Sequence, residues 1–323
     1  MARMSVWVTM KASNGSSRSA RQGKTPLTFH WQVESADVGL PLSEYLSRQL
    51  QVPPAQAVDL IDFGSVQVRG RQERDPSRPL ALQQDVIVHL PWLGVRRHYE
   101  INPQRILYRD PFVLAYDKES GVPSQQTPAD AYNNLYAAVI RYLQGGNPHP
   151  QVALHHRLDR ETSGVMIFAL DRSINSRLGK AFEQQEVTKD YLAWVEGNPS
   201  EDSWVVAEDI GRRAGRYITC PRGAGKAAAT VFRVLCREDG RSLVWAGPRT
   251  GRTHQIRLHL QWCGHSVIGD RLYGGPPAPR LYLHAYRLQL KHPRTRAAIQ
   301  LVAPVPADWP LGSCLEIPLT PMT

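Results

Sequence analysis

The feature that constrains the fold most is a polar loop of nine residues, 156–164, held between two short apolar runs. Residues 152–154 precede the loop and residues 165–170 follow it, and both runs are short enough to be buried strands. Because these strands would fix both ends of the loop, its side chains are expected to stand on a rigid base. The hydroxyl residues and Gly164 at the end of the loop suit a tight turn. Asp159, at the centre, is left without an obvious structural task, which makes it the first candidate for chemistry.

This loop and six further segments resemble one enzyme family. The loop sequence, HRLDRETSG, is similar to the HRLDxxTSG signature of the RluA-type pseudouridine synthases, which isomerise uridine in RNA. The other segments occur in the order expected of that family: ILYRDPFVLAYDKESG (106–121), VTKDY (187–191), GKAAAT (225–230), TGRTHQIRLHL (250–260), GDRLYG (269–274) and LHAYRLQLKHP (283–293). The resemblance covers residues 106–304 and departs at Glu119, where the family usually has proline. So many segments in register are far more specific than one short motif.

The resemblance implies an α+β catalytic domain over residues 106–323. In the family this domain is a large, mixed, mainly antiparallel β-sheet, bent around a basic cleft and flanked by helices. The residue pattern agrees, because short apolar runs alternate with helical stretches at 129–143 and 172–185 without a regular βαβ order. We therefore expect the pseudouridine synthase fold in this part of the chain.

Residues 32–91 are expected to form a small separate module, joined to the catalytic domain by a linker at 92–105. Its predicted elements are two helices followed by two strands, at 40–50, 54–63, 65–68 and 85–89. This order resembles the αL-type RNA-binding motif of small ribosomal proteins. Arg48 is the only arginine on either helix, so a packing module with little affinity for RNA is the alternative.

The chain carries a net charge of +10, from 39 Lys and Arg against 29 Asp and Glu, which is typical of proteins that bind polyanions. Residues 1–31 form a basic tail that we expect to be disordered, because it has too little apolar surface to bury. An organelle transit peptide and a later start at Met4 or Met10 are the alternatives.

No apolar run approaches the ~20 residues that a membrane helix needs. We expect a cytoplasmic protein with no membrane contact and no obligatory protein partner; organelle targeting by the tail is the alternative. Its four cysteines are spaced too widely for a zinc ribbon, and we expect all of them to be reduced: Cys220, Cys236, Cys263 and Cys314.

The implied reaction breaks the bond from C1′ to N1, rotates the base and joins C5 to C1′. It involves no redox change and no phosphate transfer, so we expect neither a cofactor nor a metal. In agreement, the sequence has no Gly-rich phosphate loop, no HExxH motif and no Cys/His ligand cluster.

Three residues are implied to carry the chemistry. The resemblance makes Asp159 the essential carboxylate, acting as nucleophile or as base; a turn-forming aspartate is the alternative. Arg257, the last arginine of GRTHQIR, is its implied ion partner, whereas the alternative is a strand arginine in a surface ion pair. Tyr191 would stack on the target uracil and help to remove the C5 proton, and a core tyrosine is the alternative.

Other residues are expected to hold the RNA. A stacked uridine must be flipped out, and Arg157 could fill the vacated place with its guanidinium plane; a phosphate contact is the alternative. Lys189 is expected to face RNA, and Arg252 either to face RNA phosphate or to support the loop. The resemblance implies that Leu283 packs against the reactive base, and a core leucine is the alternative. A cluster without acids is expected to form a flexible RNA-gripping loop at the rim of the cleft, and it contains Arg212, Arg213, Arg216, Arg222 and Lys226.

These features predict a stand-alone RNA pseudouridine synthase that acts by base flipping. Ribosomal RNA is the favoured substrate because of the αL-like module, and transfer RNA is the alternative. Two other classes remain open: a hydrolase of N-glycosidic bonds, which would release free uracil, and a non-catalytic RNA-binding or ribosome-assembly protein. The presence of Asp159, Tyr191 and Arg257 together favours the isomerase over the latter.

Overall fold

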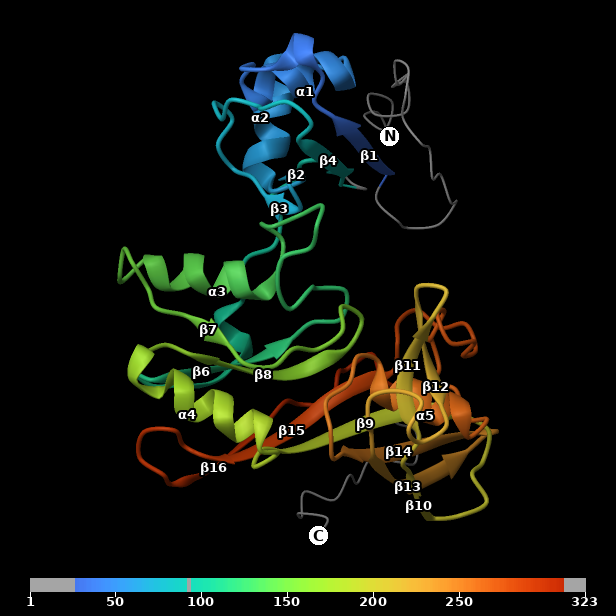
Figure 1. Cartoon of the computed structure of the whole chain (residues 1–323). Helices are drawn as coiled ribbons and strands as arrows, with labels where there is room; N and C mark the ends of the chain where they lie inside the picture. The colour runs from blue at the N-terminus through green and yellow to red at the C-terminus, as the bar shows by residue number, and fades with distance from the viewer. Residues whose placement is uncertain (1–26, 92–93, 311–323) are drawn as a thin grey trace. The chain divides into compact units, whose positions relative to one another are not determined.

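The computed structural model describes residues 27–91 and 94–310, which form two compact units (Figure 1). The small unit holds the described residues up to 101 together with residues 125–142. The large unit holds residues 102–124 and those from 143 onward. The boundaries predicted at 32, 92 and 106 stay predictions, but the compact units differ from them by placing 125–142 in the small unit.

The small unit is a four-stranded antiparallel sheet, in the order β1-β4-β2-β3, with two helices. Its elements are β1 (Leu27–Gln32), α1 (Leu42–Leu50), α2 (Pro54–Phe63), β2 (Val66–Val68), β3 (Arg71–Gln72), β4 (Asp85–Leu90) and, from the inserted segment, most of α3 (Leu135–Gln144). Pro54 opens α2 at its first position, and Gly64 ends it with φ 81°. The predicted helices and both strands are confirmed within two residues.

Two predictions for this unit need correction. Residues 27–31 are expected in the disordered tail, but they pair with β4 because Phe29 and Trp31 supply a buried face. Residues 1–26, with Met4 and Met10, lie outside the described residues. The helix expected at 129–143 starts only at Leu135, since the Asn134 side chain accepts the backbone N–H of Ala137.

The large unit is built on a ten-stranded mixed sheet, within the described residues, whose main path runs β10-β13-β14-β9-β15-β8-β6-β5. Only the pairing of β15 with β8 is parallel among the pairs described. The strands are β5 (Ile106–Arg109), β6 (Val113–Lys118), β7 (Ala153–Leu154), β8 (Ser163–Ala169), β9 (Thr188–Glu196), β10 (Ser203–Val206), β13 (Thr230–Glu238), β14 (Arg241–Pro248), β15 (Leu283–Lys291) and β16 (Ala298–Val302). This confirms the expected α+β class with a mixed, mainly antiparallel sheet.

Two helices and a separate two-stranded hairpin also belong to the large unit. Helix α4 (Arg172–Glu183) lies along β8, and α5 (Gln255–Trp262) lies beside the separate hairpin of β11 (Asp209–Arg213) and β12 (Arg216–Cys220) (Figure 1). The hairpin replaces the flexible loop expected for the basic cluster. Its turn has positive φ at both central residues, 48° at Ala214 and 77° at Gly215, which matches the twist of paired strands.

The central strand β8 is buried along its whole length, and β7 pairs with its far end, Leu154 lying opposite Phe168. The polar loop is therefore held between two strands, as predicted. No helix in the described part of the chain is long and apolar enough to cross a membrane. Cys220 and Cys263 are free, but Cys236 is disulfide-bonded, so the expectation of reduced cysteines was wrong for it. Cys314 lies outside the described residues.

Candidate active site

The backbone on both sides of Asp159 is fixed by the turn that follows β6. The buried ammonium of Lys118 donates to three carbonyls, those of Glu119 (2.9 Å), Val122 (2.7 Å) and Arg160 (3.1 Å). On the other side of Asp159, the carbonyl of Leu158 accepts a hydrogen bond from the Ser124 hydroxyl at 2.6 Å. Asp159 therefore projects from a backbone that is held before and after it.

The carboxylate of Asp159 faces Arg257, whose Nη1 lies 3.3 Å from Asp159 Oδ2. The rest of the same guanidinium is held by Asp270, with Nε and Nη2 each donating to one of its oxygens at 2.7 Å. The side chains of Arg257 and Asp270 are 7% and 1% exposed, whereas that of Asp159 is 25% exposed. Burial opposes the charge on Arg257, but the two carboxylates outweigh it and raise the pKa of the guanidinium above its usual value. Asp159 is thus the accessible end of a three-residue ionic chain.

His254 contacts the other oxygen of Asp159. Its Nε2 is 3.8 Å from Asp159 Oδ1, and its Nδ1 is 2.7 Å from the hydroxyl of Tyr273. Burial lowers the pKa of this imidazole, although the charge of Asp159 acts in the opposite direction. The ring of Tyr273 also lies 5.0 Å from the centre of the Arg257 guanidinium. One turn, 269–274, therefore contributes a partner to both Arg257 and His254.

Tyr191 lies on β9, between Ala246 of β14 and Ala285 of β15 in the register of the sheet. Burial raises the pKa of its phenol, and the charge of Asp159 adds to the increase. Leu283, on β15, is 3% exposed and belongs to the apolar cluster against which Tyr191 packs. The two residues expected to contact the base therefore share one part of the large unit.

The residues expected to hold RNA have separate environments. Arg157 is exposed, with Nη2 3.4 Å from the Thr253 hydroxyl, next to His254. Arg252 is exposed, and its Nε donates to the Ala227 carbonyl at 2.9 Å. Lys189 has its ammonium 5.7 Å from the Phe182 ring, and burial lowers its pKa.

The basic cluster lies on and just after the hairpin. All five of its cationic residues are exposed: Arg212, Arg213, Arg216, Arg222 and Lys226. The Arg212 guanidinium packs 4.7 Å from the ring of Tyr217, whose edge meets His254 at 5.7 Å between ring centres. The Thr219 hydroxyl donates to the carbonyl of Leu258 in α5 at 3.2 Å. The hairpin is therefore attached to the helix that carries Arg257.

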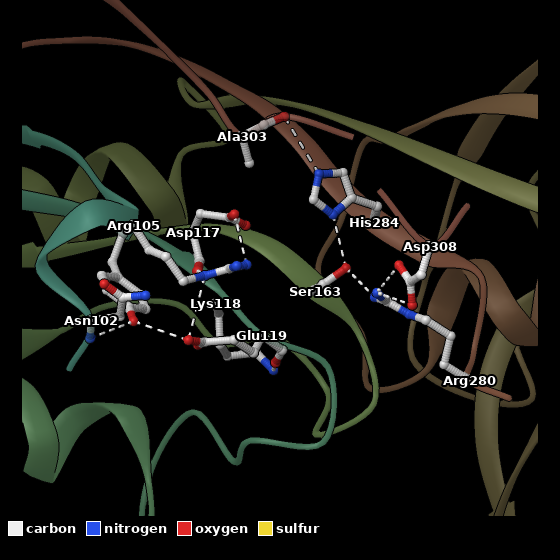
Figure 2. Close-up of polar contacts among 11 residues, drawn as sticks. Asn102, Arg105, Asp117, Lys118, Glu119, Ser163, Arg280, His284, Ala303 and Asp308 are labelled. Atoms are coloured by element: carbon white, nitrogen blue, oxygen red, sulfur yellow. Dashed lines mark hydrogen bonds and ion pairs between the residues drawn. The ribbon is translucent and has the colours of Figure 1, made fainter. Parts of the chain in front are cut away.

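A polar cluster around the buried Ser163 and His284 supports the strand that leaves the loop (Figure 2). The Ser163 hydroxyl lies 2.8 Å from His284 Nδ1 and accepts from Arg280 Nη2 at 2.5 Å, while Arg280 also pairs with Asp308. Burial lowers the pKa of His284 to about 3. Burial likewise raises the pKa of Asp117 to about 6, although Arg105 lies 2.7 Å away and acts against the increase.

Sequence reasoning missed three residues of this site: Asp270, Tyr273 and His254. The segment GDRLYG was noted as part of the resemblance, but an aspartate after glycine is typical of a turn, and no local pattern shows that it reaches Arg257. Within the described residues, no group of three or more His, Cys, Asp and Glu side chains is placed to hold a metal ion.

The chain is similar to known proteins over most of its length. The family model described as RNA pseudouridylate synthase matches residues 113–262. The ribosomal large subunit pseudouridine synthase C of Salmonella typhi is 30% identical over 319 residues, which cover 91% of this chain and 98% of that protein. An uncharacterized RNA pseudouridine synthase of Bacillus subtilis, YjbO, is 36% identical over 64% of this chain and 74% of its own length.

Solved structures give the same result. Human RNA pseudouridylate synthase domain containing 4 matches with a TM-score of 0.53 and 25% identity, over 63% of this chain and 89% of that one. Its counterpart, domain containing 1, matches with a TM-score of 0.51 and 28% identity, over 64% of this chain and 86% of that one. The chain belongs to the RluA-type family of RNA pseudouridine synthases, isomerases that convert uridine in RNA to pseudouridine.

Proposed function

We propose that Asp159 is the carboxylate that initiates the isomerisation and that the substrate is ribosomal RNA. The observation that carries the catalytic part is the ionic chain from Asp159 through Arg257 to Asp270. A carboxylate in a cleft closed by bound RNA would tend to take up a proton and lose its reactivity. The guanidinium beside Asp159 favours the ionised form and fixes its orientation.

The contacts of Asp159 and Arg257 favour these roles over the alternatives. The Asp159 carboxylate contacts a guanidinium and an imidazole, whereas a turn-forming aspartate would use its oxygens on nearby backbone N–H groups. Arg257 is 7% exposed on a helix, which does not fit the alternative of a strand arginine in a surface ion pair.

Tyr191 is proposed to be the platform for the target base. Its pKa is raised, so the phenol is protonated at neutral pH and cannot act as a preformed anionic base. Its hydroxyl would take up the C5 proton while its own proton passes to the carboxylate of Asp159, whose charge acts on this phenol. Tyr191 packs against the apolar cluster that contains Leu283, and we propose that Leu283 contacts the base beside the ring.

RNA would be held from several sides. Arg157 is exposed next to His254, in hydrogen-bond contact with the Thr253 hydroxyl, and its guanidinium would fill the place of the flipped uridine. Lys189 and the exposed basic cluster on and after the hairpin would bind phosphates. Arg252 would instead support the backbone at Ala227, whose carbonyl accepts its Nε–H.

The names of the relatives support the choice of ribosomal RNA. Those named ribosomal large subunit pseudouridine synthase C match over nearly their whole length, so we propose the same class of substrate, with transfer RNA as the alternative. The small unit, with its two helices and sheet, would contribute an RNA contact of the αL type. The protein would act in the cytoplasm, where ribosomes assemble.

The test is to map pseudouridine in cells with and without the gene. Total RNA is treated with carbodiimide, and the stops of reverse transcription are compared. We expect at least one stop in large-subunit ribosomal RNA to disappear with the gene and to return when purified enzyme is added. A stop that vanishes only from transfer RNA would contradict the substrate, and release of free uracil in vitro would contradict the isomerisation.

A further inference from the structure

The two oxygens of Asp159 face two different groups. Oδ2 lies 3.3 Å from Arg257 Nη1, and Oδ1 lies 3.8 Å from His254 Nε2. The first separation is that of a long charge-assisted hydrogen bond, and the second is longer than a hydrogen bond but within the range of an ion pair. One oxygen of the Asp159 carboxylate thus faces a guanidinium, and the other faces an imidazole.

The groups that face the two ring nitrogens, Tyr273 at Nδ1 and Asp159 at Nε2, together decide which nitrogen carries the proton. The hydroxyl lies 2.7 Å from Nδ1, so one of the two groups donates to the other. If Nδ1–H donated to the phenol oxygen, the lone pair of a neutral ring would point at the carboxylate of Asp159 and repel it. If the phenol donates to Nδ1, Nε2–H points at that carboxylate and attracts it. Electrostatics therefore selects the Nε2–H form.

Burial, with the surrounding charges in balance, keeps the His254 ring neutral. The carboxylates of Asp159 and Asp270 raise the pKa of the imidazole. The guanidinium groups of Arg157 and Arg257 lower it, so the formal charges of the four groups cancel. The rings of Tyr217 and Tyr273 also pack edge-on against the imidazole, at 5.7 Å and 5.5 Å between ring centres. With the charges balanced, burial decides the outcome and disfavours an imidazolium.

The fold holds His254 in a conformation that it would not adopt alone. Its φ is 59°, in the left-handed region, immediately before the first residue of α5. Such a backbone is strained for a residue with a Cβ atom, so it persists only where surrounding contacts hold it. Asp270 fixes the position of Tyr273, the partner of His254. Its Oδ1 accepts the backbone N–H groups of Leu272 (3.0 Å) and Tyr273 (3.1 Å), and the same carboxylate holds Arg257.

We propose that His254 is a positioning residue for Asp159: its neutral ring, oriented by Tyr273, directs Nε2–H at Oδ1 and closes to hydrogen-bond distance when the uridine is bound. This inference rests on the proposed role of Asp159. Contacts of this kind are often long in a free enzyme and shorten in the complex with substrate. The carboxylate would then be held in one plane by two donors, with its accessible edge toward C1′.

The first test compares kcat and KM of His254→Ala, His254→Gln and Tyr273→Phe on a minimal RNA substrate. Loss of orientation of a reacting group costs roughly 100-fold in rate, so we expect about that loss in kcat for His254→Ala, with KM and RNA affinity within about twofold of wild type. The amide of His254→Gln can donate toward Oδ1 and should recover about tenfold. Tyr273→Phe leaves the ring in place but unoriented, so its loss should be intermediate. Exposed His149→Ala is the control and should behave as wild type.

The second test does not depend on turnover and uses the intact wild-type enzyme. Nitrogen-15 NMR of the labelled imidazoles at pH 7 should show His254 as a neutral ring protonated at Nε2, and the pure tautomer should be lost in Tyr273→Phe. An imidazolium or an Nδ1–H ring in the wild type would overturn the proposal, and so would a normal kcat for His254→Ala. If instead Asp159→Asn proved active, the proposed function would fail while the tautomer result still reported on His254 and Tyr273.

Discussion

The guanidinium of Arg257 binds two carboxylates, that of Asp270 more closely than that of Asp159. Asp270 takes two short hydrogen bonds and is almost fully buried, whereas Asp159 has one longer contact and stays accessible. The buried pair therefore fixes the cation, and the remaining edge of the fork is presented to Asp159. Only the pairing with Asp159 was predicted, because the resemblance gave a role to Asp159 and none to Asp270.

Asp270→Asn should remove the carboxylate charge that holds the guanidinium of Arg257 in place. An unpaired buried charge typically costs about 3–5 kcal/mol, so we expect a large loss of stability together with a fall in kcat as Arg257 turns. Urea denaturation and single-turnover kinetics measure the two effects. The matched control is Asp308→Asn, which removes a carboxylate that is 59% exposed from Arg280 and should cost less than about 1 kcal/mol. Equal losses in the two variants would contradict this account of Asp270.

At the scale of elements, the basic cluster lies largely on a regular hairpin of β11 and β12, whereas a mobile loop was predicted. Glycines and arginines predicted a mobile loop, but the alternating strands and the two-residue turn give a regular ribbon whose register sets Arg213 opposite Arg216. The hydrogen bond from Thr219 to α5 ties this ribbon to the candidate site. The arginines of the hairpin are therefore fixed in spacing, and Tyr217, which packs against Arg212, also contacts His254.

Neutralising the hairpin should weaken RNA binding at all sequences alike. We expect the variant with Arg212, Arg213, Arg216 and Arg222 changed to Gln to lower the slope of log Kd against log salt by roughly 0.7–0.9 for each phosphate that the protein no longer neutralises. The measurement is a salt titration of RNA binding by fluorescence anisotropy. Arg172→Gln, an exposed arginine on α4, is the control and should leave the slope unchanged. An unchanged slope in the fourfold variant would show that the hairpin does not hold RNA.

At the scale of the whole molecule, local patterns predicted elements well and long-range pairings poorly. The helix at Pro54–Phe63 was predicted correctly because proline and glycine mark its ends. The strands around Asp159 were found because apolar runs flank a polar loop. The sequence could not show that β8 and β15 lie side by side, or that Arg257 is on a helix, because both depend on partners far away in the chain. The same limit hid Asp270 and Tyr273.

Buried histidines should make the large unit sensitive to acid. Burial lowers the pKa of His156 and of His284 to about 3, whereas an unfolded histidine titrates near 6.5. The unfolded chain thus binds more protons between these values, and the stability present above pH ~6.5 is lost as the pH falls. Asp117, with a pKa raised to about 6, takes up a proton on the folded side and acts in the opposite direction.

His156→Gln tests this linkage, because a glutamine oxygen can replace Nε2 as the acceptor of the Ile167 N–H, now at 3.0 Å. We expect the free energy of unfolding to fall less steeply between pH 6 and 4 than in wild type, by about 1.4 kcal/mol for each pH unit. Urea titrations followed by tryptophan fluorescence give the comparison. Parallel pH profiles for the two proteins would contradict the assignment of a neutral His156.

The central claim is that Asp159 starts the reaction, and single-turnover release of tritium from RNA carrying uridine labelled at C5 tests it most directly. For Asp159→Asn we expect unchanged folding and RNA affinity, with release slowed by roughly 10⁴-fold or more. Asp159→Ala serves as the companion variant, because it cannot regenerate an aspartate by deamidation. Release at a rate near that of the wild type in both variants would contradict the claim.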